Sequence, residues 1–310
     1  MAEISPIKFG KMLNKNLFPD NAFYKNSKTD EANYKTIQIP EAGTTGTAKV
    51  GDYPSLPLTI SKRTDSVKSY TTDEIYIEPK LIEREDEILL SYSKQADIIS
   101  DMAQIINTTA ADIAASAWAP TSTVLGNVFP TTGTATRTPS LVGATGTRKQ
   151  IVMADLLNVR NYFNKTNLVE GDQVYGLLTP DQINDLFEIS QLVDYDKTGE
   201  LTKLRNGEIG TILGMKLMMR WNDTLGSNGV FYSTTGVKKA LGAAVVATDA
   251  AAAIFWKNSM VRHAEGFAAM QINRNAPGYK GGTIIEAQVR FGATISRTDE
   301  KGVAAIYEAS

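Results

Sequence analysis

The chain contains no cysteine and a single histidine, His263. Without cysteine there is no disulfide, no thiolate metal site and no cysteine nucleophile, and the composition fits a protein made in a reducing cytoplasm. One histidine also excludes a metal site built from several imidazoles. His263 lies between Arg262 and Ala264 in a strand-like pattern, so we expect a packed or exposed strand residue rather than a catalytic base.

An excess of charge of either sign is also missing, since 32 Lys and Arg residues stand against 34 Asp and Glu residues, a net charge of −2. Net charge therefore gives no bulk attraction to nucleic acid. No apolar run approaches the roughly 18 residues of a membrane span, and residues 1–18 lack the unbroken apolar core of a signal peptide. With 310 residues, 42% of them hydrophobic, the chain is long enough to bury a core of about two domains.

Catalytic and ligand-binding signatures are absent as well. The sequence has no nucleophile elbow, zinc signature or dinucleotide fingerprint, and GATGTRK at 143–149 does not match a phosphate-binding loop. Residues 194–199 resemble the start of a calcium loop, but Arg205 occupies the position where a bidentate Glu belongs. We therefore assign no catalytic, cofactor-binding or metal residue and expect no enzyme and no cofactor. A carboxylate-based enzyme of α+β fold is kept as an alternative.

The most informative stretch is a long helix predicted for residues 88–118. Its apolar side chains recur at steps of three and four, and no Gly or Pro interrupts residues 80–119. Acidic residues at 83–87 suit a helix N-terminus, and Pro120 ends the helix because the residue before a proline avoids the α region. The stripe is rich in Ala and drifts from a strict heptad. We therefore expect one helix lying along an elongated domain rather than a coiled coil.

Residues 1–35 are predicted to be an arm that is ordered by packing on something, such as a neighbouring subunit, because a disordered tail would be poor in aromatic residues. Residues 35–78 read as strands at 35–40, 58–62, 67–70 and 74–78, with a long hairpin whose Gly-, Thr- and Pro-rich excursion spans 43–57. A projecting hairpin exposes unpaired strand edges, which a covering partner would protect.

The remaining chain predicts a mixture of helices and strands. A long Thr-, Gly- and Pro-rich loop is expected at 121–150, and an Ala-rich helix or buried loop at 237–253. The last strands are expected to form an antiparallel pair turned by residues 299–302. The other expected elements are helices at 151–168 and 180–190, the latter with Thr179 as N-cap, and strands at 174–178, 214–221, 229–234 and most of 254–310.

This order of elements resembles the major capsid protein of tailed bacteriophages, which has the Hong Kong 97-like fold. The resemblance implies an α+β chain with an N-terminal arm, an extended loop (E-loop) hairpin, a peripheral (P) domain with a long spine helix, and an axial (A) domain sheet. The matching stretches are 37–62 for the extended loop, 83–120 for the acidic lead-in and spine helix, 174–189 and 207–219 for the axial-domain entry, and 284–309 for the closing strands.

On this resemblance the chain divides into five segments: 1–35 arm, 36–78 extended loop, 79–171 P domain, 172–265 A domain, and 266–310 strands that return to the P domain. Two features depart from parts of the family. The sequence has no long, charged N-terminal scaffolding segment. Lys49, Lys62 and Lys68 lie on or near the extended loop, but none can be matched to the Lys–Asn cross-link of some members, so no cross-link is assigned.

The implied function is a structural one. The chain would assemble as pentamers and hexamers into an icosahedral shell that encloses phage DNA, within a virion assembled in the host cytoplasm. Its partners would be other copies of itself, scaffold, portal and decoration proteins, and packaged DNA bound non-specifically, with no membrane. The alternatives are a tail or connector protein and a nanocompartment shell of the same fold.

Overall fold

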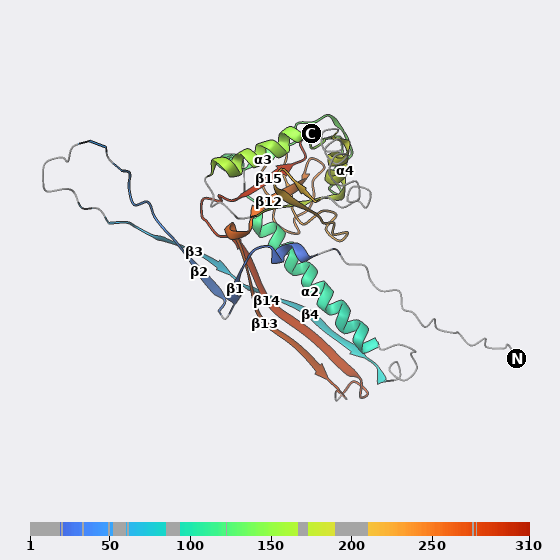
Figure 1. Cartoon of the computed structure of the whole chain (residues 1–310). Helices are drawn as coiled ribbons and strands as arrows, with labels where there is room; N and C mark the ends of the chain where they lie inside the picture. The colour runs from blue at the N-terminus through green and yellow to red at the C-terminus, as the bar shows by residue number, and fades with distance from the viewer. Residues whose placement is uncertain are drawn as a thin grey trace.

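A four-stranded sheet forms the elongated lower part of the molecule in this computed structural model (Figure 1). The sheet is antiparallel except at its edge, where β1 runs parallel to β13. In spatial order its strands are β1 (Lys28–Ala32), β13 (Val261–Asn273), β14 (Thr283–Ile295) and β4 (Asp73–Ile82). The structure describes residues 19, 21–32, 34–48, 50–51, 60, 62–84, 94–121, 123–166, 173–189, 210–274, 276 and 278–310.

The long helix α2 (Lys94–Trp118) lies along one face of this sheet, against β14 and β4. Met102 and Ile106 of α2 pack on Ile285 and Ala287 of β14 and on Ile82 of β4. The predicted helix is confirmed where it is described, and it ends at Trp118 as expected; residues 88–93 of the prediction lie outside the described residues.

A second sheet of seven strands forms the upper part of the molecule. Its central strand β12 is buried along its whole length. One face of β12 packs against the Ala-rich second half of α2, and the other packs against α3 and α4. The strands in spatial order are β5 (Val128–Pro130), β15 (Val303–Tyr307), β12 (Ala250–Lys257), β8 (Val174–Leu178), β10 (Met215–Met219) and β9 (Thr211–Ile212), with β11 (Phe231–Tyr232) on β12; the helices are α3 (Met153–Lys165) and α4 (Pro180–Glu188).

Shorter elements complete the fold. A separate hairpin pairs β2 (Thr36–Glu41) with β3 (Ser66–Thr71), and a second small pair joins β6 (Ala135–Arg137) to β7 (Arg148–Lys149). Three 3-10 turns are described: η1 (Ala22–Lys25), η2 (Thr123–Leu125) and η3 (Asn258–Met260).

Several predicted elements agree closely with the structure. The strand at 174–178 has the predicted bounds, and α4 begins at Pro180 after a capping box in which Thr179 accepts a hydrogen bond from the Gln182 backbone N–H. Strong local signals, a buried apolar run and an N-cap followed by proline, are sufficient at these positions.

Two predictions about the second half of the chain are wrong. Ala250–Ala253 was expected in a helix or buried loop, but these residues begin the central strand β12. Alanine has little intrinsic preference for strands, yet here its small side chain lets neighbouring layers approach closely. The last two strands do not pair with each other: β14 belongs to the four-stranded sheet and β15 to the seven-stranded sheet. The turn at 299–302 therefore carries the chain from one sheet to the other.

Three further expectations need correction. The segment 121–150 is not an unstructured loop, since it contains η2, β5, β6 and β7 and buries Leu141 and Arg148. The strand before Pro79 continues through that proline to Ile82, which an edge strand permits because the missing N–H would face outward. In the expected strand at 58–62, the described residues Ile60 and Lys62 have no regular structure.

The described part of the N-terminal arm packs on its own chain. Phe23 is 2% exposed and packs against Trp118 at the end of α2 and Trp256 of β12. Tyr24 contacts His263 and Phe291 of the four-stranded sheet. The described part of the arm is thus ordered by packing, as expected, but the surface it packs on belongs to the same subunit and not to a neighbouring one. Residues 1–18 and 20 lie outside the described part.

Candidate assembly surfaces

The hairpin β2–β3 projects from the side of the molecule and continues into a long excursion (Figure 1). Asp65 lies at the base of this excursion, which we call the hairpin neck. Its carboxylate accepts hydrogen bonds from the Gly43 backbone N–H and from Arg63 Nη2, each at 2.9 Å. Past this neck the described residues have no regular structure and touch no compact core.

The root of the hairpin is fixed to the connection between β14 and β15. Glu41 accepts a hydrogen bond from Thr298 Oγ1 at 2.7 Å and lies 3.5 Å from Arg297 Nη2. Lys68 Nζ donates to the Arg297 carbonyl oxygen at 2.9 Å. Arg297 also pairs with Asp299 and holds the pKa of that carboxyl well below its usual range. These contacts set the direction of the hairpin relative to both sheets.

Apolar side chains on the hairpin point into water in an isolated subunit. Val50 and Ile60 are 103% and 97% exposed, and Val67 of β3 is more than half exposed. Fully burying an aliphatic side chain of this size is worth about 1.5–3 kcal/mol. A neighbouring molecule that packs against the hairpin would supply that burial.

A buried arginine joins the seven-stranded sheet, helix α2 and the arm. Arg220, directly after β10, places Nη2 2.6 Å from Asp112 Oδ1 of α2. Its Nη1 donates to the Asn228 carbonyl oxygen at 2.8 Å, and its Nη2 donates to Asn21 Oδ1 at 3.1 Å. The guanidinium also lies 5.5 Å from the centre of the Phe23 ring. Removing either charge would leave the other buried without its partner.

A second buried cluster holds two carboxylates around one guanidinium. Arg137 Nη1 lies 2.7 Å from Asp185 Oδ2 of α4, and Arg137 Nη2 lies 2.5 Å from Glu308 Oε1 near the C-terminus. Ser140 donates to Glu308 through both its backbone N–H and its hydroxyl. Burial raises the pKa of Asp185 to about 6 and also raises the pKa of Glu308, while Arg137 opposes both shifts.

This carboxylate pair lacks the access that catalysis requires. The side chains of Asp185 and Glu308 are 4% and 0% exposed, so neither oxygen can reach a substrate from solution. The cluster instead connects α4, the C-terminal strand and the segment 121–150. The alternative of a carboxylate-based enzyme therefore gains no support from it.

His263 is buried on β13, as one of the two structural outcomes expected for it. Ser27 Oγ lies 2.6 Å from His263 Nδ1 but donates its single proton to the Tyr24 carbonyl oxygen at 2.7 Å. His263 Nδ1 must then carry the proton and donate to Ser27, so the imidazole cannot activate this hydroxyl as a nucleophile. Burial lowers the pKa of His263, in keeping with a neutral ring.

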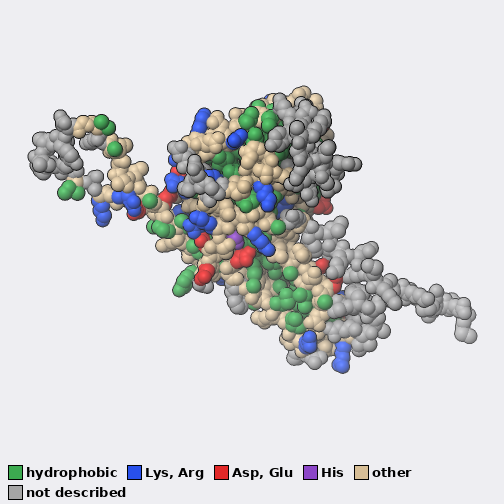
Figure 2. Space-filling view, viewed as in Figure 1, with side chains coloured by type: hydrophobic (Ala, Val, Ile, Leu, Met, Phe, Trp, Pro, Cys, Tyr) green, Lys and Arg blue, Asp and Glu red, His purple; other side chains and the backbone are tan. Residues whose placement is uncertain are grey.

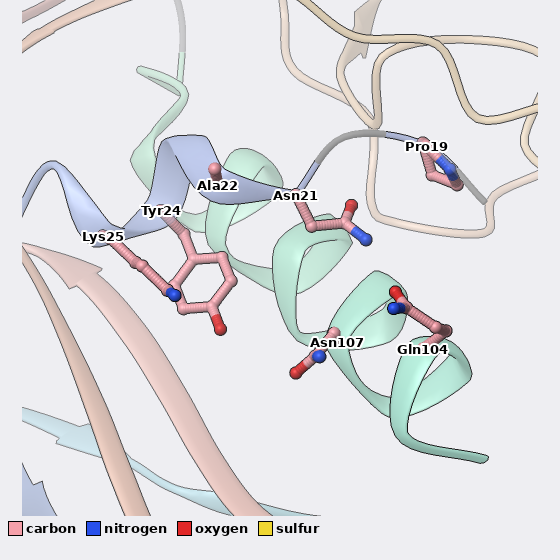
Figure 3. A pocket seen from close by; sticks show the side chains of 7 residues that line it. All are labelled: Pro19, Asn21, Ala22, Tyr24, Lys25, Gln104 and Asn107. Carbon is pink, nitrogen blue, oxygen red and sulfur yellow. The ribbon is translucent and has the colours of Figure 1, made fainter. Parts of the chain in front are cut away.

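A small pocket of about 230 Å³ lies between η1 and α2 (Figure 3). Its lining includes Asn21 and Tyr24 from the arm and Gln104 and Asn107 from α2. The pocket is open and polar, and it presents no titratable pair suited to catalysis. In the described ranges no group of three or more His, Asp or Glu residues could hold a metal ion. No described helix has the length and hydropathy of a membrane span.

Several residues weighed from the sequence have defined places, and others do not. Lys68 is half-buried against the Arg297 carbonyl oxygen, and Lys62 is exposed beside the hairpin neck. The calcium-like stretch 194–199, Arg205 and Lys49 lie outside the described residues. Sequence reasoning missed Arg220, Arg137 and Glu308, because no local signal shows which distant charges will be buried together.

A projecting hairpin with a fixed root and exposed apolar side chains is typical of a subunit that packs against other molecules. The sequence comparison identifies the family: a sequence model described as phage capsid protein matches residues 26–309. The chain therefore belongs to the phage capsid protein family, and it is a major capsid protein that forms an icosahedral shell. No curated protein matches the sequence.

Solved structures show the same fold at low sequence identity. A chain from Mycobacterium phage Che8 matches with a TM-score of 0.66 and 15% identity, over 99% of this chain and 98% of that one. The capsid of cyanophage P-SCSP1u gives 0.68 and 16%, over 99% and 94%. The capsid of a native GTA particle gives 0.60 and 8%, over 99% and 96%. The α+β, Hong Kong 97-like fold predicted from the order of elements is confirmed.

Proposed function

We propose that this capsid protein assembles as pentamers and hexamers, and that the shell encloses phage DNA. The observation that carries the proposal is the β2–β3 hairpin, whose root is fixed by Glu41 and Lys68 while its apolar loop residues remain in water. A hairpin whose root is already fixed in direction needs less ordering when it reaches a neighbour, and many such repeated contacts stabilise a closed shell.

The same proposal assigns roles to the two sheets. The four-stranded sheet with α2 would act as the P domain, and the seven-stranded sheet with α3 and α4 as the A domain. The chain passes between the two sheets more often than the division into five consecutive segments suggests. Within 79–171, α3 packs on the seven-stranded sheet, and within 266–310, β15 belongs to that sheet as well.

Further partners belong to the proposal. Assembly would take place in the host cytoplasm with a separate scaffold protein, a portal and decoration proteins, and DNA would be held non-specifically. A net charge of −2 suits a container that encloses DNA without a strong uniform attraction to it. The protein would have no enzymatic activity and no cofactor.

The hairpin provides the test. Residues 42–65 can be replaced by an Asn-Gly turn, which joins antiparallel strands with the correct twist, so that β2 and β3 remain paired. We expect the variant to fold, by circular dichroism and thermal unfolding, and to stay unassembled in electron micrographs. Closed shells formed by this variant would contradict the proposed role of the hairpin.

A further inference from the structure

The arm segment 21–27 lies in the corner where the two sheets meet, beside α2 (Figure 1 and Figure 3). The corner is formed by a short connection, since β12 of the seven-stranded sheet ends at Lys257 and β13 of the four-stranded sheet begins at Val261, with η3 between them. Figure 2 shows the broad upper part of the body and the narrower lower part that extends from it. A segment in this corner contacts both parts and is placed to fix the angle between them.

Two successive aromatic residues of the arm are divided between the two sheets. The ring centre of Phe23 lies 6.1 Å from that of Trp256 in β12. The ring centre of Tyr24 lies 5.9 Å from that of Phe291 in β14. All four rings belong to one buried core cluster, and edge-to-face contacts of this kind favour defined ring orientations. Phe23 and Tyr24 therefore connect the strands of both sheets through a single peptide bond.

Polar contacts hold the segment on both sides of the aromatic pair. Before it, Asn21 Oδ1 accepts from Arg220 Nη2 at 3.1 Å, and Asn21 Nδ2 donates to Thr108 Oγ1 of α2 at 3.0 Å. After it, the Asn26 carbonyl oxygen accepts from Trp256 Nε1 at 2.9 Å, and the chain then enters β1, which pairs with β13. The segment is thus attached to α2, to the seven-stranded sheet and to the four-stranded sheet.

Helix α2 also spans both sheets, but mostly with small side chains. Along its second half, up to Trp118, its buried apolar residues are Ala110, Ala111, Ala114 and Ala115. A methyl group makes far fewer van der Waals contacts than an aromatic ring, so an alanine stripe resists a change of angle only weakly. The two arm rings supply the contact that this stripe lacks.

We infer that residues 21–27 are a positioning segment, which fixes the angle between the two sheets and thereby the curvature at which subunits assemble. The rotation between neighbouring copies decides whether a ring or shell closes. A subunit whose two parts vary in angle therefore builds shells of varying diameter. The angle is a property of the single subunit, whereas its effect on shells rests on the proposed assembly.

Two spin labels measure the angle in unassembled subunits. Because the chain contains no cysteine, Leu157→Cys on α3 and Tyr76→Cys on β4 place one label on each part, at side chains that are 47% and 71% exposed. Double electron–electron resonance should give a narrow distribution of label distances in the otherwise wild-type chain. Phe23→Ala should at least double the width of this distribution, because the contact with Trp256 is lost. An unchanged width in folded Phe23→Ala would overturn the inference.

Two further variants separate positioning from a general loss of order. Asn21→Ala removes the contacts with Arg220 and Thr108 but keeps the aromatic pair, and we expect it to widen the distribution as well. It decides the test if circular dichroism shows that Phe23→Ala does not fold. Lys25→Ala changes an exposed residue of η1 and should leave the width unchanged. Equal widening in Lys25→Ala and Asn21→Ala would also overturn the inference.

Shell diameters give a second readout, which a purely stabilising role of the segment would not change. In electron micrographs, shells of Asn21→Ala should show a spread of diameters at least twofold wider than shells of the wild type and of Lys25→Ala. A wild-type spread from a variant with widened label distances would refute the link to curvature. Failure of the wild-type chain to form shells would instead count against the proposed function, and the label distances would still test the segment.

Discussion

At Asp185, burial and the nearby Glu308 both oppose the charged carboxylate and raise its pKa to about 6. The folded state therefore binds a proton more tightly than the unfolded state, in which Asp has a pKa near 3.9. The stabilisation from this group is complete below about pH 4 and is lost as the pH rises through 6. Its size is at most about 3 kcal/mol, at 1.36 kcal/mol per pKa unit.

Asp185→Asn should remove this dependence while keeping a group of similar shape beside Arg137. The expected result, measured by urea unfolding of unassembled subunits from pH 4 to 7, is a free energy of unfolding that falls less with rising pH than that of the wild type. Glu308→Gln serves as a companion variant, because its pKa is raised by the same burial. An unchanged pH profile in Asp185→Asn would show that the carboxyl is not protonated in this range.

The contribution of His263 to stability changes with pH in the opposite direction to that of Asp185. Burial lowers its pKa, so the folded state binds a proton less readily than the unfolded state. The stabilisation from this group is present above the unfolded value near 6.5 and is lost as the pH falls below it. The two groups therefore partly cancel in the wild-type protein between pH 5 and 7.

His263→Asn keeps a donor for Ser27 but cannot take up a proton. We expect a cost of about 1–3 kcal/mol, because the ring loses its packing against Tyr24 and Phe291. In unfolding measurements, stability should then fall more steeply with rising pH than in the wild type, since the Asp185 contribution is left unopposed. A steeper loss at acid pH would contradict this assignment.

Among the elements, the C-terminus of α2 depends on a residue far away in the chain. Lys238 Nζ donates to the carbonyl oxygens of Ser116 and Ala119, each at 3.0 Å, and so supplies a donor to groups at the helix end, where intrahelical partners run out. The Ser116 carbonyl oxygen also accepts from the Ala119 backbone N–H at 3.3 Å. Burial lowers the pKa of this lysine, although Glu300 favours its charged form.

Lys238→Met should lower the free energy of unfolding by about 1–3 kcal/mol, because two partly buried carbonyl oxygens lose their donor. Lys239→Met is the matched control. Its ammonium is one-third exposed and lies 3.6 Å from Asp249, which keeps a hydrogen bond from the Val246 backbone N–H, so the expected change is below about 1 kcal/mol. Equal effects in chemical denaturation would show that Lys238 does not cap the helix.

Elements with strong local signals were predicted correctly from the sequence. Elements whose secondary structure or pairing depends on contacts between distant residues were not. Thr179 with Pro180, and the apolar stripe ending at Trp118, are local signals that predicted the start of α4 and the end of α2. Ala250–Ala253 form a strand only because two layers pack on β12, which no local pattern reveals. The placement of β14 and β15 in different sheets also depends on contacts between distant residues, so no local pattern could predict it.

Across the whole molecule, the order of elements carried more information than any residue signature. The order of arm, hairpin, long helix, axial-domain entry and closing strands was sufficient to predict the fold and the capsid family, which the family match confirms. The contacts that fix the hairpin could not be foreseen, since Glu41 and Thr298 are joined from opposite ends of the chain. The order of elements along the chain therefore predicts the family, whereas the polar contacts between distant residues are seen only in the structure.

The central claim is that this chain builds a closed shell from identical subunits, and electron microscopy combined with light-scattering mass tests it most directly. The full chain should be measured across salt and protein concentration, with and without a crowding agent. The account predicts closed shells, or rings of five and six subunits, with masses that are multiples of 33.7 kDa. Monomers and small dimers under every condition, crowding included, would contradict it.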